Sequence, residues 1–305
     1  MNNATVTHLF IYPIKSCAGI ELNDCTFNQY GFQYDRHWIV GSKKEDGSWK
    51  MVTQREYSRM VLIQPKLIFD GGKYPTLILN APGMDEISIN TIITSDPVFI
   101  PVWKSEVSGY IQSDLVSKWL SDFLGIDCSL FVKDPELERP LIKKHTPALD
   151  KFDYNPQTAF ADGFPFLLLS EESVKDFSSQ LPEGIAIRLL TFRPNIVVAG
   201  LSPYEEDEIL SLQIGTIQFF VAARTTRCRM VNNTPEGVPG TEVLKLIQRI
   251  RRVDPGAKYE GCMGVNVIHR VANGTISVGD QLIINQKGVH DRRGIWNQSD
   301  TPTAY

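Results

Sequence analysis

The stretch VTHLFIYPI, residues 6–14, gives the clearest indication of the fold. It is rich in β-branched and aromatic residues, as β-strands are. Residues 32–41, FQYDRHWIVG, repeat the type around Trp38. Turn-forming residues separate these short strands, as at Asp46-Gly47 and Gly71-Gly72. Repeated short strands with tight turns favour a β-barrel or a sandwich for about the first 100 residues.

A helix is expected after these strands. Apolar residues at helical spacing over 115–124 predict it, with Ser113 as its N-cap and Gly125 at its end. We interpret it as a helix that packs against the core. The following polar stretch, residues 133–155, contains several prolines and has no clear periodicity, so we expect it to connect two parts of the fold.

A second strand-rich block begins near Phe160. Ser170 is expected to cap a helix over 171–180, and Thr241 to cap another that ends before the turn at 254–256. Residues 276–284 predict a hairpin that turns at Gly279-Asp280. The other strands of this block are expected at 164–169, 196–199, 217–222 and 265–269. The chain therefore reads as an α+β, β-rich fold with a few helices.

Composition and charge narrow the function classes. The 305 residues are 42% hydrophobic and 22% charged, which is ordinary for a soluble globular protein. A net charge of -4 argues against a general nucleic-acid binder, which needs a basic surface for phosphate contacts. No apolar run reaches the roughly 20 residues that span a bilayer. The start of the chain has no basic leader, so we expect no signal or transit peptide and a cytoplasmic protein.

Cysteine usage points to a reducing compartment. Five cysteines are widely spaced and include no C-x-x-C pair. An odd number at such spacing argues against a disulfide framework and against a tetrahedral zinc site.

The densest chemical signal is RTTRCR, residues 224–229, where three arginines surround Cys228 directly after an apolar strand. Neighbouring cations favour a thiolate, so a lowered pKa is expected for Cys228, which could act as a nucleophile or as a soft-metal ligand. A solvated basic loop with an incidental thiol explains the same residues equally well.

Three further clusters carry cations at the ends of strands: YPIKSC at 12–17, YDRHW at 34–38 and FRPN at 192–195. Arginine suits bidentate recognition of phosphate or carboxylate. Several such clusters in a slightly acidic chain suggest one anion-binding pocket, although each cluster alone is more commonly a structural salt bridge.

These residues carry a family resemblance. The chain resembles the molybdenum-cofactor sulfurase C-terminal (MOSC) superfamily, in particular its amidoxime-reducing type with an N-terminal β-barrel domain. The matching stretches run in order along nearly the whole chain: residues 12–17, 34–38, 102–103, 119–125 (WLSDFLG), 162–171 (DGFPFLLLSE), 192–195, 227–228 and 274–280 (GTISVGD). The resemblance implies an N-terminal barrel domain at 1–125, a connecting segment at 126–159, a MOSC barrel domain at 160–286 and a polar, mobile tail at 287–305.

The resemblance also implies a pterin-dithiolene molybdenum cofactor with Cys228 as the protein ligand to the metal. The residues that it places around the cofactor's phosphate or pterin are Lys15, Ser16 and Arg36 from the first domain, Asp162 and Gly163, and then Arg193, Asn195, Thr226 and Arg227 from the second. A soft thiolate suits molybdenum, and arginines suit the phosphate. The wider family is also associated with pyridoxal phosphate binding.

The implied function is reduction of small N-hydroxylated compounds: hydroxylamines, amidoximes or N-hydroxylated bases. No iron–sulfur domain follows in the sequence, so a separate electron-transfer protein is expected: a b-type cytochrome, a flavoprotein or a ferredoxin-type donor. One alternative is a protein that carries or handles the cofactor or its sulfur without reducing a substrate. Another is a thiol enzyme with Cys228 as the nucleophile, which would need His37 or His269 beside it as a base.

A few other residues carry weaker expectations. His37 and Asp162 are candidate proton donors by their motifs alone. Cys17 and Cys25 read as small buried hydrophobes. Cys262 lies in a glycine-rich loop and could line the substrate side of the site, whereas His269, at the end of an apolar strand, reads as a core histidine.

Overall fold

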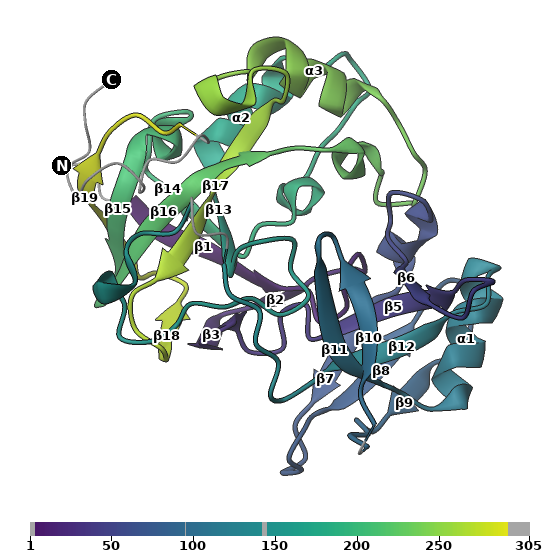
Figure 1. Cartoon of the computed structure of the whole chain (residues 1–305). Helices are drawn as coiled ribbons and strands as arrows, with labels where there is room; N and C mark the ends of the chain where they lie inside the picture. Colours follow the sequence, from purple (N-terminus) through teal and green to yellow (C-terminus); the bar gives the residue numbers. More distant parts are fainter. Residues whose placement is uncertain (1–3, 95, 142–144, 292–305) are drawn as a thin grey trace.

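A computed structural model describes residues 4–94, 96–141 and 145–291 of the chain. Two β-structures lie next to each other, and the described residues form three α-helices on their outer surfaces (Figure 1). The fold is therefore α+β and β-rich, as the sequence predicts.

Seven strands close the larger structure into a barrel. In order around the ring they are β14 (Ile196–Ala199), β13 (Phe166–Ser170), β17 (Cys262–His269), β16 (Ile217–Thr226), β15 (Ile209–Ile214), β19 (Gln281–Lys287) and β1 (Ala4–Ile11). Antiparallel pairing of β1 with β14 closes the ring, and β2 (Ile20–Leu22) pairs with the end of β1. The first strand of the chain thus completes a barrel whose other strands all come from the second half.

This closure differs from the expected division of the chain. The strand predicted over 6–14 was assigned to the first domain, but β1 pairs with β14 and β19, and its buried Val6 and Leu9 belong to the core of the barrel. The strand also ends earlier than expected, because Pro13 cannot donate a hydrogen bond to a ladder. The boundary proposed at residue 125 therefore does not separate the two β-structures.

The second structure is a five-stranded sheet. Its strands are, in order, β10 (Val98–Val102), β11 (Ser105–Ile111), β12 (Ser129–Lys133), β5 (Trp38–Lys43) and β6 (Trp49–Met51). The edge strands β10 and β6 lie against each other, so the sheet is nearly closed. β12 falls inside the expected connecting segment at 126–159, yet it pairs with both β5 and β11. The connection therefore begins only after Lys133.

Two small sheets complete the β-structure. They are β7 (Gln64–Ile68), β8 (Thr76–Asn80) and β9 (Ile87–Ile89), and β18 (Gly274–Ser277), β3 (Asp24–Asn28) and β4 (Gly31–Phe32). The predicted hairpin over 276–284 is wrong. Its turn forms, with Gly279 at φ 95°, but β18 pairs with β3 while β19 pairs with β15 and β1. The turn passes the chain from one sheet to another.

All three predicted helices are present: α1 (Asp114–Leu124), α2 (Glu171–Ser179) and α3 (Glu242–Ile250). Gly125 ends α1 in the left-handed conformation, and the Ser170 hydroxyl accepts a hydrogen bond from the Ser173 amide at the start of α2. Thr241 behaves differently, because its hydroxyl donates to Glu242. The Asn232 side chain instead accepts from the Leu244 amide at 2.8 Å and caps α3 from twelve residues earlier in the chain.

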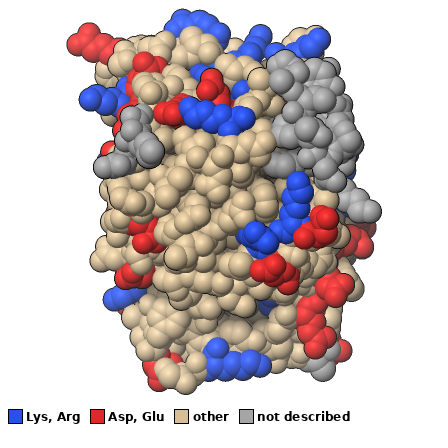
Figure 2. Space-filling view, turned by 90° about the vertical axis from the view of Figure 1, so that its left-hand side faces the viewer, with Lys and Arg blue, Asp and Glu red and all other residues tan. Residues whose placement is uncertain are grey.

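The start of the expected polar tail belongs to the fold. Lys287 ends β19, and His290 is fully buried with its ring against the Ile209 carbonyl. Residues 292–305 lie outside the described residues. On the face that Figure 2 shows, lysines and arginines are interspersed with acidic residues around a broad uncharged area and form no continuous basic surface.

Candidate functional site

The sequence-predicted residues meet where the loop after β1 lies between the two β-structures. Lys15 donates from its backbone amide to the Trp38 carbonyl at 2.9 Å, and the Arg36 amide donates to the Tyr12 carbonyl at 2.8 Å. These bonds fix residues 12–16 against the start of β5. The clusters at 12–17 and 34–38, separate in the sequence, therefore form one wall.

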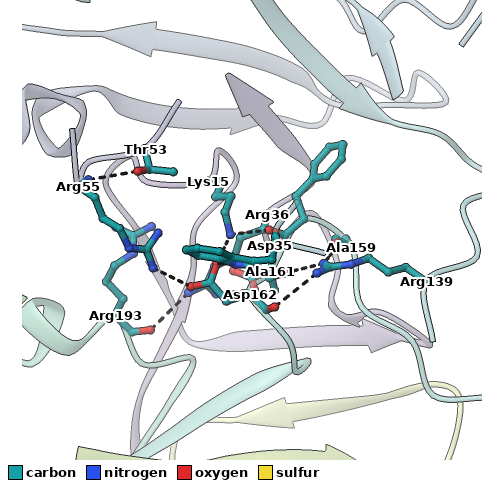
Figure 3. Close-up of polar contacts among 12 residues, drawn as sticks. Lys15, Asp35, Arg36, Thr53, Arg55, Arg139, Ala159, Ala161, Asp162 and Arg193 are labelled. Atoms are coloured by element: carbon teal, nitrogen blue, oxygen red, sulfur yellow. Dashed lines mark hydrogen bonds and ion pairs between the residues drawn. The ribbon is translucent and has the colours of Figure 1, made fainter. Parts of the chain in front are cut away.

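Asp162 is the polar centre of this region (Figure 3). Its side chain is about half exposed, at 52%, and pairs with the buried Lys15 ammonium group. Arg55 donates to Asp162 Oδ2 at 3.2 Å, and Trp103 Nε1 donates to Oδ1 at 3.0 Å. Arg139 approaches from the other side and donates to the carbonyls of Ala159, Ala161 and Asp162. Four side chains thus hold one short segment in place.

Charge decides the protonation of this cluster. Burial raises the pKa of Asp162, but the Lys15 and Arg55 cations outweigh it and hold that pKa well below its usual range. Asp162 is therefore ionised at neutral pH. Burial lowers the pKa of Lys15 to about 8, and Asp162 opposes the shift. Lys15 is mostly protonated at neutral pH. Of its three N–H groups, one donates to Asp162 and one donates to the Phe160 carbonyl at 2.8 Å, so the third remains available.

A stack of cations joins the two β-structures beside Asp162. The Arg36 guanidinium lies 4.3 Å from the centre of the Tyr12 ring, and the Arg193 guanidinium lies 4.1 Å from it. Arg193 also donates to the Cys17 carbonyl at 2.6 Å. Two like charges close to one ring are costly unless an anion lies nearby. Asp35 offsets part of this charge through its ion pair with Arg36.

Asn195 fixes the position of Arg36 in this stack. It is buried, its Oδ1 accepts from Arg36 at 3.1 Å and from the Leu167 amide at 3.2 Å, and its Nδ2 donates to the Phe10 carbonyl at 3.1 Å. Through these bonds Asn195 positions Arg36.

The Cys228 loop adjoins this stack. β16 ends at Thr226, which pairs with Cys262 of β17, and Cys228 is the residue before the 3₁₀ helix η6 (Arg229–Asn232). Arg227 donates to the Phe192 carbonyl at 2.6 Å, next to Arg193. Burial lowers the pKa of Arg227 to about 10, while Cys228 and Asp162 raise it, so Arg227 lies near both groups and stays charged. Cys228 itself is half-buried.

Several buried polar atoms in this region have no partner among the described residues. They include Ser16 Oγ, Arg193 Nη2 and Arg227 Nε. Three buried donors left open in one place favour binding of an acceptor-rich anionic group. Gly163, next to Asp162, also has no protein atom within 4 Å of the position that a Cβ would occupy.

Backbone strain concentrates at the same place. Among the described non-glycine residues with positive φ are Ser16 at 72°, Arg36 at 46°, Arg193 at 56° and Trp103 at 59°. Left-handed backbone is costly for such residues and is typically kept at functional sites. Three of these four residues were singled out from the sequence.

Arg224 and His269 have partners of their own within the fold. Arg224 donates to the Val253 and His290 carbonyls at 3.1 and 3.0 Å. Arg229 is exposed. Arg227, in contrast, contacts the Phe192 carbonyl next to Arg193. His269 is buried and hydrogen-bonded to the Tyr154 hydroxyl and the Asn28 carbonyl, as a core histidine would be.

Sequence reasoning missed Arg55, Arg139 and the contact that Trp103 makes. Arg55 follows Thr53-Gln54 in a loop, and Arg139 lies in the connecting segment, where no local pattern marks a binding residue. Within the described ranges, no group of three or more His, Cys, Asp or Glu could hold a metal ion.

Comparison with known proteins identifies the family of this chain. A MOSC N-terminal beta barrel domain matches residues 3–127, and a MOSC domain matches residues 155–283. The chain belongs to the MOSC-domain family. The bovine (Bos taurus) mitochondrial amidoxime reducing component 2 is 32% identical over 91% of this chain and 82% of its own length.

Two further relatives of this MOSC protein have names that indicate different activities. The mouse (Mus musculus) mitochondrial amidoxime-reducing component 1 is 32% identical over 92% of this chain and 82% of its own length. The tomato (Solanum lycopersicum) molybdenum cofactor sulfurase is 26% identical over 92% of this chain but only 36% of its own length. The bovine and mouse relatives are thus named for amidoxime reduction, and the tomato relative is named for the molybdenum cofactor. Within the described part of the chain, no helix is long and apolar enough to cross a membrane.

Proposed function

We propose that this MOSC protein is a molybdenum-cofactor enzyme that reduces N-hydroxylated compounds with electrons from a separate donor protein. The observation that carries the proposal is the set of open, buried donors on Ser16, Arg193 and Arg227, which lies beside the half-buried Cys228. The names of the bovine and mouse relatives support the amidoxime-reducing activity.

The residues present fit the cofactor. Its phosphate would be held by the Arg36 and Arg193 guanidinium groups, whose mutual repulsion an anion relieves. Lys15 and the Ser16 hydroxyl would add hydrogen bonds from the same loop. Thr226, Arg227 and Gly163 would lie along the pterin, and the Cys228 thiolate would bind the metal. Asn195 would position Arg36.

The cofactor would supply the two-electron chemistry that cleaves the N–O bond, and the protein supplies binding, orientation and electrostatics. Asp162 is ionised, so it orients an N–H or O–H group of the substrate and is no source of protons. Burial lowers the pKa of His37 to about 3, which leaves its ring neutral and excludes it as an acid near neutral pH. We propose that protons reach the reaction from solvent at the exposed side of Asp162.

A cofactor- or sulfur-handling role is the second candidate, and the tomato sulfurase relative favours it. In that role Cys228 would hold a persulfide without turnover of a substrate. The thiol-enzyme alternative loses support, because His269 is committed to Tyr154 and Asn28, and the His37 ring packs against Tyr34 and Trp38. A role for pyridoxal phosphate gains no support either, since the Lys15 side chain is held by Asp162.

We also propose a cytoplasmic location and a b-type cytochrome, flavoprotein or ferredoxin-type electron donor. All five cysteines are free, and this supports a reducing compartment.

The decisive experiment measures metal and pterin in protein made by a host that synthesises the cofactor. We expect close to one molybdenum per chain in wild type and almost none in Cys228→Ala, because the thiolate is the only protein ligand. Cys25→Ala, which changes a buried barrel cysteine, is the matched control and should keep its metal.

Wild-type protein without molybdenum or pterin would refute a cofactor-binding role. Loaded protein should also reduce an amidoxime when an artificial electron donor is present. Loaded protein that reduces no N-hydroxylated compound would favour the handling role.

A further inference from the structure

Trp103 occupies the tip of the hairpin between β10 and β11, where Val102 pairs with Ser105. Its φ of 59° is left-handed, a conformation that two-residue hairpin turns require and that Asn or Gly normally supplies. A tryptophan here therefore costs stability. The hairpin belongs to the five-stranded sheet, yet its tip reaches Asp162 at the edge of the other β-structure.

Two polar contacts fix the orientation of the ring. Its Nε1–H donates to Asp162 Oδ1 at 3.0 Å, and the Arg55 guanidinium lies 4.5 Å from the ring centre. Arg55 in turn donates to Asp162 Oδ2. The three side chains form a closed triangle, so the indole is held rigidly although it lies at the surface.

The ring remains open to solvent in spite of these contacts. Trp103 is 51% exposed, whereas Trp38 is fully buried and Trp119 is 7% exposed. Because one face of the indole lies against Arg55, the exposed area indicates that the opposite face is free. A rigid, free aromatic face next to a half-exposed carboxylate has the composition of a binding wall for a flat ligand.

We propose that Trp103, fixed by Arg55 and Asp162, is the specificity-determining wall that stacks on planar substrates, which makes conjugated amidoximes and N-hydroxylated bases better substrates than small aliphatic hydroxylamines. This inference rests on the proposed reductase function. Asp162 would accept a hydrogen bond from the N–H or O–H edge of the flat group while the indole covers its face.

Steady-state kinetics of the loaded enzyme test the inference with benzamidoxime, which is planar and aromatic, and N-methylhydroxylamine, which is neither. Trp103→Leu should raise KM for benzamidoxime about tenfold, with kcat changed less, and should leave KM for N-methylhydroxylamine unchanged. Trp103→Phe keeps a ring and should retain most of the affinity for benzamidoxime. Phe99→Leu, on the same hairpin and 61% exposed, is the control and should alter neither substrate.

A second readout does not depend on turnover. Benzamide, which is planar and cannot be reduced, should quench tryptophan fluorescence in wild type and in Phe99→Leu, and the quench should disappear in Trp103→Phe. A quench that survives in Trp103→Phe would overturn the inference, as would a Trp103→Leu variant with equal effects on both substrates. If neither substrate is reduced but the Trp103-dependent quench is seen, the reductase proposal fails and the planar binding wall stands.

Discussion

Tyr12 shows how the role of a residue depends on partners that are distant in sequence. Its ring lies between Arg36 and Arg193, and its hydroxyl donates to the Pro194 carbonyl at 3.1 Å. The sequence identifies cations at the ends of strands as an anion pocket, but nothing local pairs residue 12 with residue 193. The chemical character of the site was therefore predictable, and its geometry was not.

Glu206 gives a prediction at the same scale. It is buried, accepts hydrogen bonds from Ser170 and Ser173, and has its pKa raised from 4.5 to about 7 by burial and by Asp207. The folded chain thus keeps a proton that the unfolded chain loses, and the stability due to this group is full below about pH 4.5 and lost as the pH rises to about 7. The unfolding free energy of Glu206→Gln relative to wild type should increase between pH 5 and pH 8, on the order of 2 kcal/mol.

Urea unfolding at the two pH values measures this difference. The neighbouring Glu205 is the control, because its hydrogen bond with Lys287 lowers its pKa. Glu205 is therefore ionised in both the folded and the unfolded chain above pH 5, and the stability of Glu205→Gln relative to wild type should stay nearly constant between pH 5 and pH 8. A relative stability of Glu206→Gln that is independent of pH would show that Glu206 titrates normally.

At the scale of elements, helix ends were predictable when the signal was local. Ser170 and Gly125 act within one turn of their helices, and both behave as their residue types predict. Thr241 has the right residue type at the right position, but the capping bond comes from Asn232, twelve residues before Leu244. A long-range cap leaves no pattern in the sequence of the helix itself.

The cap of α3 can be tested directly. Asn232→Ala removes the acceptor for the Leu244 amide and should lower the free energy of unfolding by about 1 kcal/mol. Thr241→Ala removes an exposed hydroxyl that bonds the adjacent Glu242 side chain and should be nearly neutral. Chemical denaturation of both variants makes the comparison, and a larger loss in Thr241→Ala would reverse the assignment.

Strand pairing was the least predictable feature of the elements. The turn at Gly279 was found from the sequence because glycine there supplies a positive φ. The strands that pair with β18 and β19 could not be predicted, since pairing depends on which buried faces meet after the chain has turned. For the same reason no strand was predicted where β12 lies, in the expected connecting segment, although Leu130 and Val132 are fully buried.

At the scale of the molecule, the domains seen in sequence and the sheets seen in space do not coincide. The family matches end at residue 127 and resume at residue 155, yet β1 is part of the second barrel. Sequence similarity follows the chain, whereas the barrel closes because β1 pairs with β14, from Thr5 opposite Ala199 to Leu9 opposite Ile196.

A fragment experiment tests this dependence. Residues 126–305 alone lack β1, so β14 and β19 should be left with open edges, and the fragment should show no cooperative thermal transition. A synthetic peptide of residues 1–28 should restore the transition when it is added. Cooperative unfolding of the fragment without the peptide, followed by circular dichroism, would show that β1 is dispensable.

The position of β1 also has a consequence for the order in which the chain folds during synthesis. β1 is made before all of its barrel partners, and one of them, β19, ends only at Lys287. All strands of the five-stranded sheet have been made once Lys133 is added, so this sheet can form while β1 is still an unpaired apolar segment. Contacts that span so much of the chain slow folding, and an exposed edge invites association with other chains in the meantime. Yield in the cell should therefore depend on chaperones that bind nascent extended segments.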